Sequence, residues 1–387
     1  MNNYLCRIID EIIMENPFII SGRIKPEFFC DRVEESQRIV HSIVTGGENI
    51  VIVSPRRMGK TGLIYHCFDK PEVKDQVTTI FVDILRTSSL QELTYLLGRA
   101  VFKTLGSRSP KMMKNIIDTL WSLRGSFGYD PVQGTPTFDI KLGEITNPAY
   151  TLEEIFSCLE QAEQHCVVAI DEFQQIVNYP DKNVEALMRT HIQQSTNANF
   201  IFSGSERHIM GQMFLDHARP FYQSASMLSL APISKDVYSH FVTEHFNSHH
   251  RVVSQDAIDT VYHMFEGNTY YLQKVFHEAF SASISGKPCD KALVEGIIAD
   301  LITESNHRYS ETLARLTLPQ KELLYAIASD GRAGHVTSMQ FIKRHHLPSA
   351  SSVQAAMRKL IEYGMISTEN GEYYVEDQLF YHWLKSS

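Results

Sequence analysis

The sequence predicts an α/β fold in which helices cover both faces of a parallel β-sheet. Through roughly the first 230 residues, short apolar runs rich in β-formers alternate with segments of helical periodicity. Runs that are apolar throughout, instead of alternating with polar residues, are typical of strands buried on both faces of a parallel sheet. We therefore expect a sandwich whose loops lie at the carboxyl ends of the strands.

Five runs are predicted to form this sheet, and each ends at a residue that breaks a strand or carries chemistry. The first ends at Ser54 before a helical stretch, and the second leads into a helix near Ser88, where Ser88-x-x-Gln91 has the pattern of a capping box. The third ends at two carboxylates, the fourth at a Gly-Ser turn, and the fifth before Pro232. The runs span residues 50–53, 78–84, 166–170, 199–203 and 227–230.

The rest of the chain predicts an insertion and two further domains. Residues 106–150 are interrupted by glycine and proline and contain one alternating stretch, T-F-D-I-K-L-G-E-I, which we interpret as a β-ribbon inserted on the sheet. The pattern from 234 to 305 is helical, and three more helical patterns follow Leu318-Pro319. Asn370-Gly371 between β-formers then predicts a hairpin, and three helices with a hairpin form a winged helix. We place the domains at residues 1–231, 232–308 and 309–387.

Composition limits where the protein works. Of 387 residues, 43% are hydrophobic and 21% charged, as in an ordinary globular protein, and the net charge of −9 argues against a large basic arm for nucleic acid. The six cysteines form no C-x-x-C pair, so neither a zinc site nor a redox motif is indicated. Asp10 and Glu11 interrupt the first apolar run, unlike in a signal peptide, and no run approaches the ~18 residues that a membrane span needs. We expect a cytoplasmic protein without membrane contact.

The first motif with chemistry is S-P-R-R-M-G-K-T, between the first strand and its helix. A phosphate-binding (Walker A) loop needs backbone N–H groups at a helix amino terminus, a lysine that reaches the β- and γ-phosphate oxygens, and a hydroxyl that binds Mg²⁺. Gly59, Lys60 and Thr61 have the right types in the right order, and Pro55 holds Ser54, where the motif usually has glycine, in an extended conformation. The alternative is an ordinary basic loop. The expected nucleotide contacts are Ser54, Pro55, Arg56, Arg57, Met58, Gly59, Lys60, Thr61 and Gly62.

The second motif, V-V-A-I-D-E, is an apolar strand that ends in Asp171 and Glu172. In a phosphate-loop fold Asp171 would hold Mg²⁺ together with Thr61, and Glu172 would orient and deprotonate the attacking water. Carboxylates after a strand also cap helices, but together with the loop they predict hydrolysis of ATP. Ser203 and Ser205, at the end of the next strand, are candidates for contact with the γ-phosphate or the water. A simple turn is the alternative for these serines.

These motifs and others along the chain resemble those of the archaeal-type ATPase family, within the AAA+/STAND class of P-loop NTPases. The resemblance covers nearly the whole chain. The element expected at the nucleotide base has Asp31 in place of glycine and Val33 in place of glutamate, the lid motif has Thr269 in place of proline, and no arginine occupies the sensor-2 place after Gly267. The matching segments are Phe29–Glu35, Pro55–Thr61, Phe202–Ser205, Gly267–Gln273 and Tyr373–Phe380.

The resemblance implies a P-loop NTPase sandwich of the ASCE type with sheet order 5-1-4-3-2, a helical lid and a carboxyl-terminal winged helix. It implies that Arg32 lies at the nucleotide base. It also implies that Arg219, just before the last strand, acts as an arginine finger at the ATP of a neighbouring subunit. An arginine that caps a helix end in its own chain is the alternative for Arg219, and a solvated loop is the alternative for Arg56 and Arg57.

Charge leaves the partner of the winged helix open. Its predicted recognition helix carries Gln354, Arg358 and Lys359, and the preceding turn carries Lys343 to His346. From Tyr309 onward, however, the chain has eight basic and eight acidic residues, so this segment has no net charge. DNA affinity comes mainly from neutralisation of phosphates by basic residues. Docking of a protein is therefore the alternative to DNA.

The main hypothesis is an ATPase that binds ATP and Mg²⁺, hydrolyses ATP to ADP and phosphate with Lys60, Glu172 and Arg219, and acts as a nucleotide-driven switch on an unknown partner. A protein client is one candidate for this partner. Oligomers are compatible with this hypothesis. The alternative is an ATP-liganded, DNA-binding regulator with little turnover. A third option, a phosphotransferase acting on a metabolite, lacks a visible acceptor site.

Overall fold

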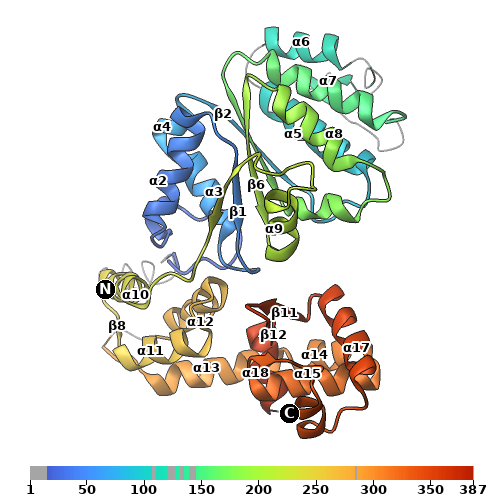
Figure 1. The fold of residues 1–387 in the computed structure, drawn as a ribbon. Helices are drawn as coiled ribbons and strands as arrows, with labels where there is room; N and C mark the ends of the chain where they lie inside the picture. Colours follow the sequence, from blue (N-terminus) through green and yellow to red (C-terminus); the bar gives the residue numbers. More distant parts are fainter. Residues whose placement is uncertain are drawn as a thin grey trace, which may run out of the picture. The chain divides into compact units, whose positions relative to one another are not determined.

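The computed structural model describes residues 15–106, 110–120, 122, 127–130, 135–138, 145–283 and 286–386. They form two compact units, whose elements Figure 1 labels. One unit spans residues 21–233, and the other joins residues 15–20 to those from 234 onward. Among the described residues, no helix combines the length and the apolar character that crossing a bilayer requires.

The first unit is built on a five-stranded sheet in which all neighbouring strands are parallel, as the sequence predicts. The order β2-β5-β6-β1-β7 becomes 5-1-4-3-2 when the five strands are numbered along the chain and read from the β7 edge. The order implied by the family resemblance is thus confirmed. The strands are β1 (Ile50–Val53), β2 (Thr78–Asp83), β5 (Cys166–Asp171), β6 (Ala198–Gly204) and β7 (Ser226–Ser229).

Helices cover both faces of this sheet because successive side chains of its buried strands are apolar on either side. Val51 and Val53 of β1 belong to one core, and Ile50 and Ile52 belong to the other. Figure 1 shows the two helical layers. The first core includes residues of α5 (Leu90–Gly106), α7 (Pro148–Glu160), α8 (Val184–Gln194) and α9 (Arg207–Leu215), and the second includes residues of α2 (Val33–His41), α3 (Lys60–Asp69) and α4 (Pro71–Lys74).

The cap of α5 is displaced by one residue from the predicted capping box. Ser89 Oγ accepts a hydrogen bond from the N–H of Glu92 at 3.3 Å, and the Glu92 carboxylate accepts one from the N–H of Ser88 at 2.5 Å. Gln91 turns elsewhere and donates to the carbonyl of Ile145 at 3.1 Å. The predicted box Ser88-x-x-Gln91 is therefore wrong, since Ser89 and Glu92 satisfy the same spacing one residue later.

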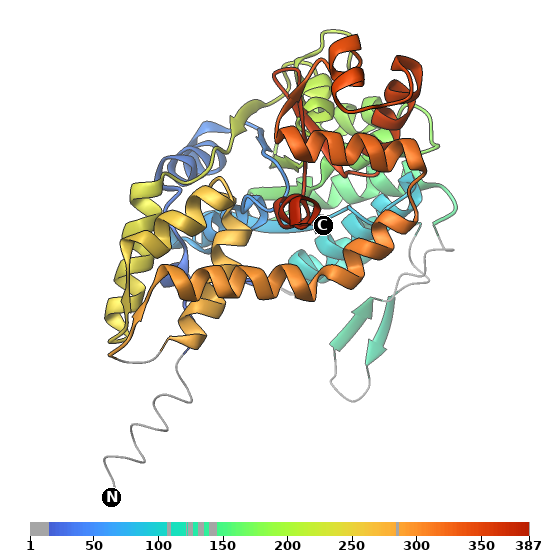
Figure 2. The same cartoon turned by 90° about the horizontal axis from the view of Figure 1, so that it is seen from below.

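The insertion after α5 contains more than the predicted ribbon. A helix, α6 (Pro110–Thr119), comes first and buries Met112 and Ile116 in the core. Two strands, β3 (Phe127–Asp130) and β4 (Thr135–Phe138), then pair antiparallel, and Figure 2 shows this ribbon apart from the large sheet. Most of the alternating stretch expected to form the ribbon, residues 139–144, lies outside the described residues.

The second unit opens with a helical lid that also holds the amino-terminal residues of the described chain. Residues 15–20, predicted to belong with the first domain, pack on these helices instead. Phe18 is fully buried, with ring centroids 5.8 Å from Phe241 and 5.7 Å from Phe276, and Asn16 Nδ2 donates to the His277 carbonyl at 2.9 Å. The lid helices are α10 (Lys235–Ser248), α11 (Gln255–Met264), α12 (Thr269–Ala282) and α13 (Lys291–Glu304).

The predicted winged helix forms the end of the second unit. Asn370 and Gly371 have φ angles of 52° and 83°, the left-handed pair that a two-residue hairpin turn requires, and Glu369 pairs with Glu372 across this turn. The helices are α14 (Asn306–Ala314), α15 (Leu318–Asp330), α16 (Met339–Arg344), α17 (Ala350–Glu362) and α18 (Gln378–Ser386), with a three-stranded sheet of β10 (Ala333–Gly334), β12 (Glu372–Val375) and β11 (Ile366–Glu369).

Asp377 joins the lid to the winged helix. Its Oδ1 accepts hydrogen bonds from the hydroxyl of Tyr271 in α12 at 2.5 Å, from that of Tyr309 in α14 at 3.2 Å, and from the N–H of Phe380 in α18 at 2.9 Å. Both tyrosines are buried, and burial raises the pKa of Tyr309, so its hydroxyl remains a donor. The lid motif and the carboxyl-terminal motif of the family resemblance therefore meet at one carboxylate.

Replacing Asp377 by alanine is expected to destabilise the second unit by roughly 2–4 kcal/mol, because two buried hydroxyls and the first turn of α18 lose their acceptor. Urea unfolding followed by Trp383 fluorescence, in a Trp121→Phe background, measures this loss. The matched control is Asp300→Ala, on an exposed face of α13, which should change stability by less than about 0.5 kcal/mol. Equal stability of the two variants would contradict the role of Asp377.

Candidate active site

The phosphate-loop motif forms a tight turn between β1 and α3. Ser54 is fully buried and keeps a negative φ, whereas Arg57 and Gly59 are left-handed, with φ of 69° and 88°. Any side chain at Gly59 would be strained in this conformation. Helix α3 starts at Lys60, and its N-cap residue, Gly59, has no side chain that could cap the first turn. The first N–H groups of a helix and its dipole together favour binding of an anion.

Lys60 is buried inside this loop. Its Nζ donates to the carbonyl oxygens of Ser54 at 3.1 Å and Pro55 at 3.2 Å, and reaches Ser54 Oγ at 3.4 Å. Burial of an ammonium is unfavourable unless it is well hydrogen-bonded. The loop carbonyls thus hold the cation at the amino end of α3, where phosphate oxygens would add an opposite charge.

Thr61 and Asp171 meet next to this lysine. Thr61 Oγ1 donates to Asp171 Oδ2 at 2.5 Å, although the two residues are 110 positions apart in the chain. Burial raises the pKa of Asp171, and this effect is opposed by the hydroxyls of Thr61 and Ser203 and by the charge of Lys60. A hydroxyl and a buried carboxylate are oxygen ligands of the kind that Mg²⁺ prefers, so these residues fit the predicted metal.

Glu172 starts a turn out of β5. Its backbone is left-handed, with φ 56° and ψ 42°, a conformation that costs a non-glycine residue about 1–2 kcal/mol. Its Oε2 accepts hydrogen bonds from Ser205 Oγ at 2.7 Å and from Gln174 Nε2 at 2.5 Å. Gln174 is not among the sequence-based candidates, although its polar side chain two residues after Glu172, in the run F-Q-Q-I-V, is a signal that could have identified it.

Arg32, expected at the nucleotide base, is buried and bonded to the phosphate loop. Its Nη2 reaches the Met58 carbonyl at 3.4 Å, and its Nη1 donates to the Ala231 carbonyl at 2.7 Å and to Glu35 at 2.9 Å. The same segment packs against α3. Phe29 lies so close to Gly62 that a Cβ added to this glycine would be 3.9 Å from the phenyl ring. Arg32 therefore connects the segment before β1 with the phosphate loop and with the end of β7.

The other three predicted arginines are not among these buried groups. Arg56 and Arg57 are exposed on the loop. Arg219 Nη2 forms an ion pair with Glu185 of α8 at 2.5 Å, and burial raises the pKa of Glu185 while the arginine lowers it. In this structure the guanidinium of Arg219 is thus held by its own chain.

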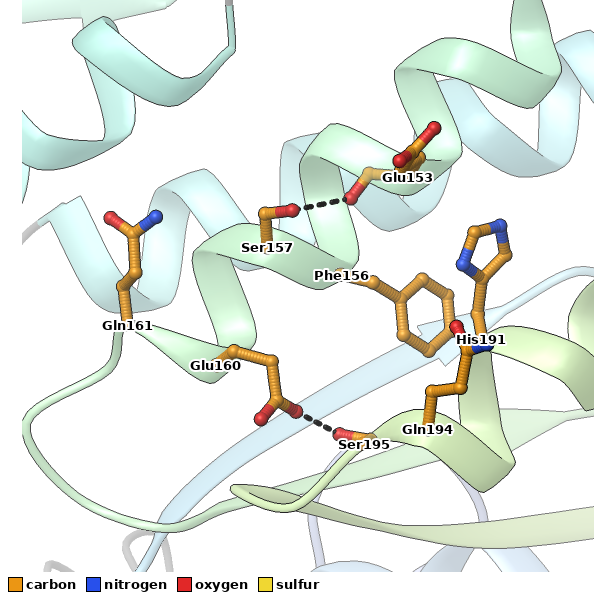
Figure 3. A pocket seen from close by; sticks show the side chains of 8 residues that line it. All are labelled: Glu153, Phe156, Ser157, Glu160, Gln161, His191, Gln194 and Ser195. Atoms are coloured by element: carbon orange, nitrogen blue, oxygen red, sulfur yellow. Dashed lines mark hydrogen bonds between the residues drawn. The ribbon is translucent and has the colours of Figure 1, made fainter.

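A hollow of about 310 Å³ lies between α7 and α8, and Figure 3 shows its lining. None of the predicted site residues lines it. Its Glu160 carboxylate accepts hydrogen bonds from Ser195 Oγ and from the N–H of Thr196, and the His191 ring stacks on Phe156 at 4.9 Å. These polar and aromatic groups therefore stabilise the ends of the two helices.

The fold and the site define a P-loop NTPase-type protein with a helical lid and a winged helix. A family described as an ATPase domain predominantly from Archaea matches residues 29–275, and a probable winged helix domain matches residues 307–386. The first match spans more than half of the chain. The chain therefore belongs to this archaeal ATPase family.

Solved structures share the fold over nearly the full length. A Walker-type ATPase of Pyrococcus abyssi aligns with a TM-score of 0.66 and 17% identity over 95% of this chain and 99% of that chain. The ORC2 protein of Aeropyrum pernix, in ADPNP–ADP complexes, has a TM-score of 0.57 and 12% identity over 97% of each chain. The ORC1 protein of the same organism, in complex with DNA, has a TM-score of 0.52 and 13% identity over 93% of each chain. At these identities the likeness shows the fold alone. No curated protein matches the chain.

Replacing Asp171 by asparagine is expected to raise the melting temperature of the nucleotide-free protein. Burial raises the pKa of Asp171 above its ordinary value of 3.8, so the folded state binds more protons than the unfolded state. The free energy of unfolding of the wild type therefore falls as pH rises from 3.8 through the pKa of Asp171 in the folded state. The asparagine variant lacks this contribution because its side chain does not titrate. A difference of about 1 kcal/mol in the free energy of unfolding corresponds to a shift of roughly 2–4 °C in the melting temperature.

Melting temperatures of both proteins between about pH 4 and pH 7 test this expectation, and their difference should widen with pH. Asp75→Asn, at an exposed aspartate after α4, is the matched control for removing one carboxylate from this unit. Parallel curves for wild type and Asp171→Asn would mean that burial does not penalise this carboxylate.

Proposed function

We propose that this protein binds ATP with Mg²⁺, hydrolyses it to ADP and phosphate, and acts as a nucleotide-driven switch. The observation that carries the proposal is the convergence of Lys60, Thr61 and Asp171 at the carboxyl end of the sheet, with Glu172 next in the chain. Membership of the ATPase family supports the same conclusion.

Each residue has a role that follows from its chemistry. Lys60 and the N–H groups of the loop would bind the β- and γ-phosphate oxygens, and Thr61 and Asp171 would hold Mg²⁺, whose charge neutralises the phosphates. Glu172 would orient the attacking water and accept its proton. We further propose nucleotide contacts by Ser54, Pro55, Arg56, Arg57, Met58, Gly59, Gly62, Arg32, Ser203 and Ser205.

Glu172→Gln is expected to retain ATP affinity and to lose turnover by about 10²–10⁴-fold, because the change removes the base and preserves the size of the side chain. Steady-state release of phosphate measures turnover, and a thermal-shift titration measures binding. Hydrolysis by Glu172→Gln at the wild-type rate would place activation of the water elsewhere.

Lys60→Ala is the variant that separates binding from chemistry in the same experiment. At ATP·Mg²⁺ near 100 times its Kd, the wild type should gain about 2.7 kcal/mol, and Glu172→Gln should gain as much. Lys60→Ala should lose most of this shift. Equal shifts in all three proteins would mean that ATP does not bind at this loop.

We propose for Arg219 the role of a finger in a neighbouring subunit, which requires that it leave Glu185. Turnover per subunit should then rise with protein concentration, and Arg219→Ala should abolish the rise without weakening binding of ATP. If Arg219 only anchors α8, Arg219→Ala and Glu185→Gln should instead lower the free energy of unfolding alike, by roughly 1 kcal/mol. A wild-type rate independent of concentration excludes the finger.

The alternative function, a DNA-binding regulator with little turnover, has less support. In the winged helix, Arg344 pairs with Asp330, and Lys359 pairs with Glu362 at 2.7 Å. Cations that already have acidic partners contribute less to binding of phosphates. Turnover measured with and without duplex DNA separates the two functions.

A further inference from the structure

We propose that Gln174 is a positioning residue that, together with Ser205, fixes the Glu172 carboxylate for the attacking water. The inference rests on the proposed hydrolysis of ATP. Gln174 lies on the short 3₁₀ helix η5 (Phe173–Asn178), which begins directly after Glu172.

Two side chains converge on one carboxylate oxygen of Glu172. Gln174 Nε2 donates to Glu172 Oε2 at 2.5 Å, and Ser205 Oγ donates to the same oxygen at 2.7 Å. Gln174 Nε2 also reaches Ser205 Oγ at 3.4 Å, so the three groups close a triangle. Only 1% of Gln174 and 7% of Ser205 is exposed, which shields these hydrogen bonds from competing water. Hydrogen bonds to a charged group are about twice as strong as neutral ones.

The arrangement leaves the second oxygen of Glu172 for other chemistry. Within the described part of the chain, both side-chain hydrogen bonds of this carboxylate go to Oε2, and the side chain is half-buried rather than enclosed. With Oε2 held and the backbone turned by its positive φ, the direction of Oε1 is fixed. A general base must lie within hydrogen-bond reach of the proton that it takes, so a fixed Oε1 is what the proposed reaction needs.

The surrounding fold makes room for Gln174. A Cβ at Gly204 would lie 2.6 Å from Gln174 Oε1 and 2.5 Å from Met210 Cγ, so a glycine at this position allows the amide to approach. The carbonyl of Gly204 also accepts the N–H of Ser54 at 3.5 Å, at the start of the phosphate loop. The end of β6 therefore contacts both the loop and the residue that positions the base.

The energetics of Gln174 also favour a role beyond packing. Its Oε1 is buried and has no hydrogen-bond partner among the described residues. An unsatisfied buried acceptor destabilises the folded state, and an apolar side chain of similar length would avoid this penalty. The amide nitrogen of Gln174, which donates to Glu172, therefore gives a reason for a glutamine at this position.

The test compares the steady-state ATPase kinetics of two neighbouring glutamines. Gln174→Met keeps the length of the side chain and removes both donors, and we expect kcat to fall about 10- to 100-fold, because displacements near 1 Å have effects of this size, with KM for ATP within about twofold. The matched control is Gln175→Met. Gln175 lies on the same 3₁₀ helix but donates to the Thr87 carbonyl at 3.0 Å, and its loss should leave kcat within about twofold.

A double variant shows whether Gln174 acts through Glu172. In a Glu172→Gln background, Gln174→Met should lower the residual rate no further, because coupled residues are not additive. Ser205→Ala removes the other donor to Glu172 Oε2 and should also lower kcat. If Gln174→Met lowers the melting temperature by many degrees, Ser205→Ala becomes the variant that tests whether the bonds to Glu172 Oε2 matter for kcat.

Three outcomes overturn the inference, and they are distinguishable. An unchanged kcat in a folded Gln174→Met, or in Ser205→Ala if Gln174→Met does not fold, overturns it while the proposed ATPase stands. A further loss in the Glu172→Gln background, equal to that in the wild type, assigns Gln174 an independent role. A wild type that binds ATP without hydrolysing it overturns the proposed function and the inference together.

Discussion

The hydrogen bond between Thr61 and Asp171 sets the geometry on which the rest of the site depends. Thr61 belongs to the helix after β1, and Asp171 ends β5, while β6 lies between these two strands in the sheet. The end of β6 serves both neighbouring strands. The Ser203 hydroxyl acts on the Asp171 carboxylate, and a Cβ at Gly204 would collide with Met210 and with Gln174 Oε1. The small residues at the end of the fourth run thus fit the side chains that gather around Asp171 and Glu172.

Features that depend on local sequence could be predicted. Buried parallel strands are apolar throughout, so their runs in the sequence coincide with the observed strands to within one or two residues, and Asn370-Gly371 specifies its hairpin because few other residues accept two positive φ angles. The cap of α5 shows the limit of such reasoning. Ser88 and Ser89 both suit a cap, with Gln91 and Glu92 at matching spacing, and only the packing of the folded chain decides between the two registers.

Contacts between distant segments could not be predicted in this way. Phe18 has the same type as many core residues, and nothing near it in the sequence specifies the lid helices that bury it. The pairing of Arg219 with Glu185 likewise depends on how α8 packs beside the segment before β7. Gln174 was within reach of sequence reasoning, but its significance appears only when β6 places Ser205 at the same carboxylate oxygen.

The stability of the folded chain does not by itself explain these side chains. Lys60 is a buried ammonium, burial raises the pKa of Asp171, Glu172 has a left-handed backbone, and Gln174 Oε1 lacks a partner among the described residues. Each feature is unfavourable for folding, and each would be relieved by apolar or glycine substitutions. Such features persist where a ligand or a reaction uses them. Their concentration at the carboxyl end of one sheet, around the phosphate-loop motif, is the physical reason why we propose this edge as the site of ATP hydrolysis.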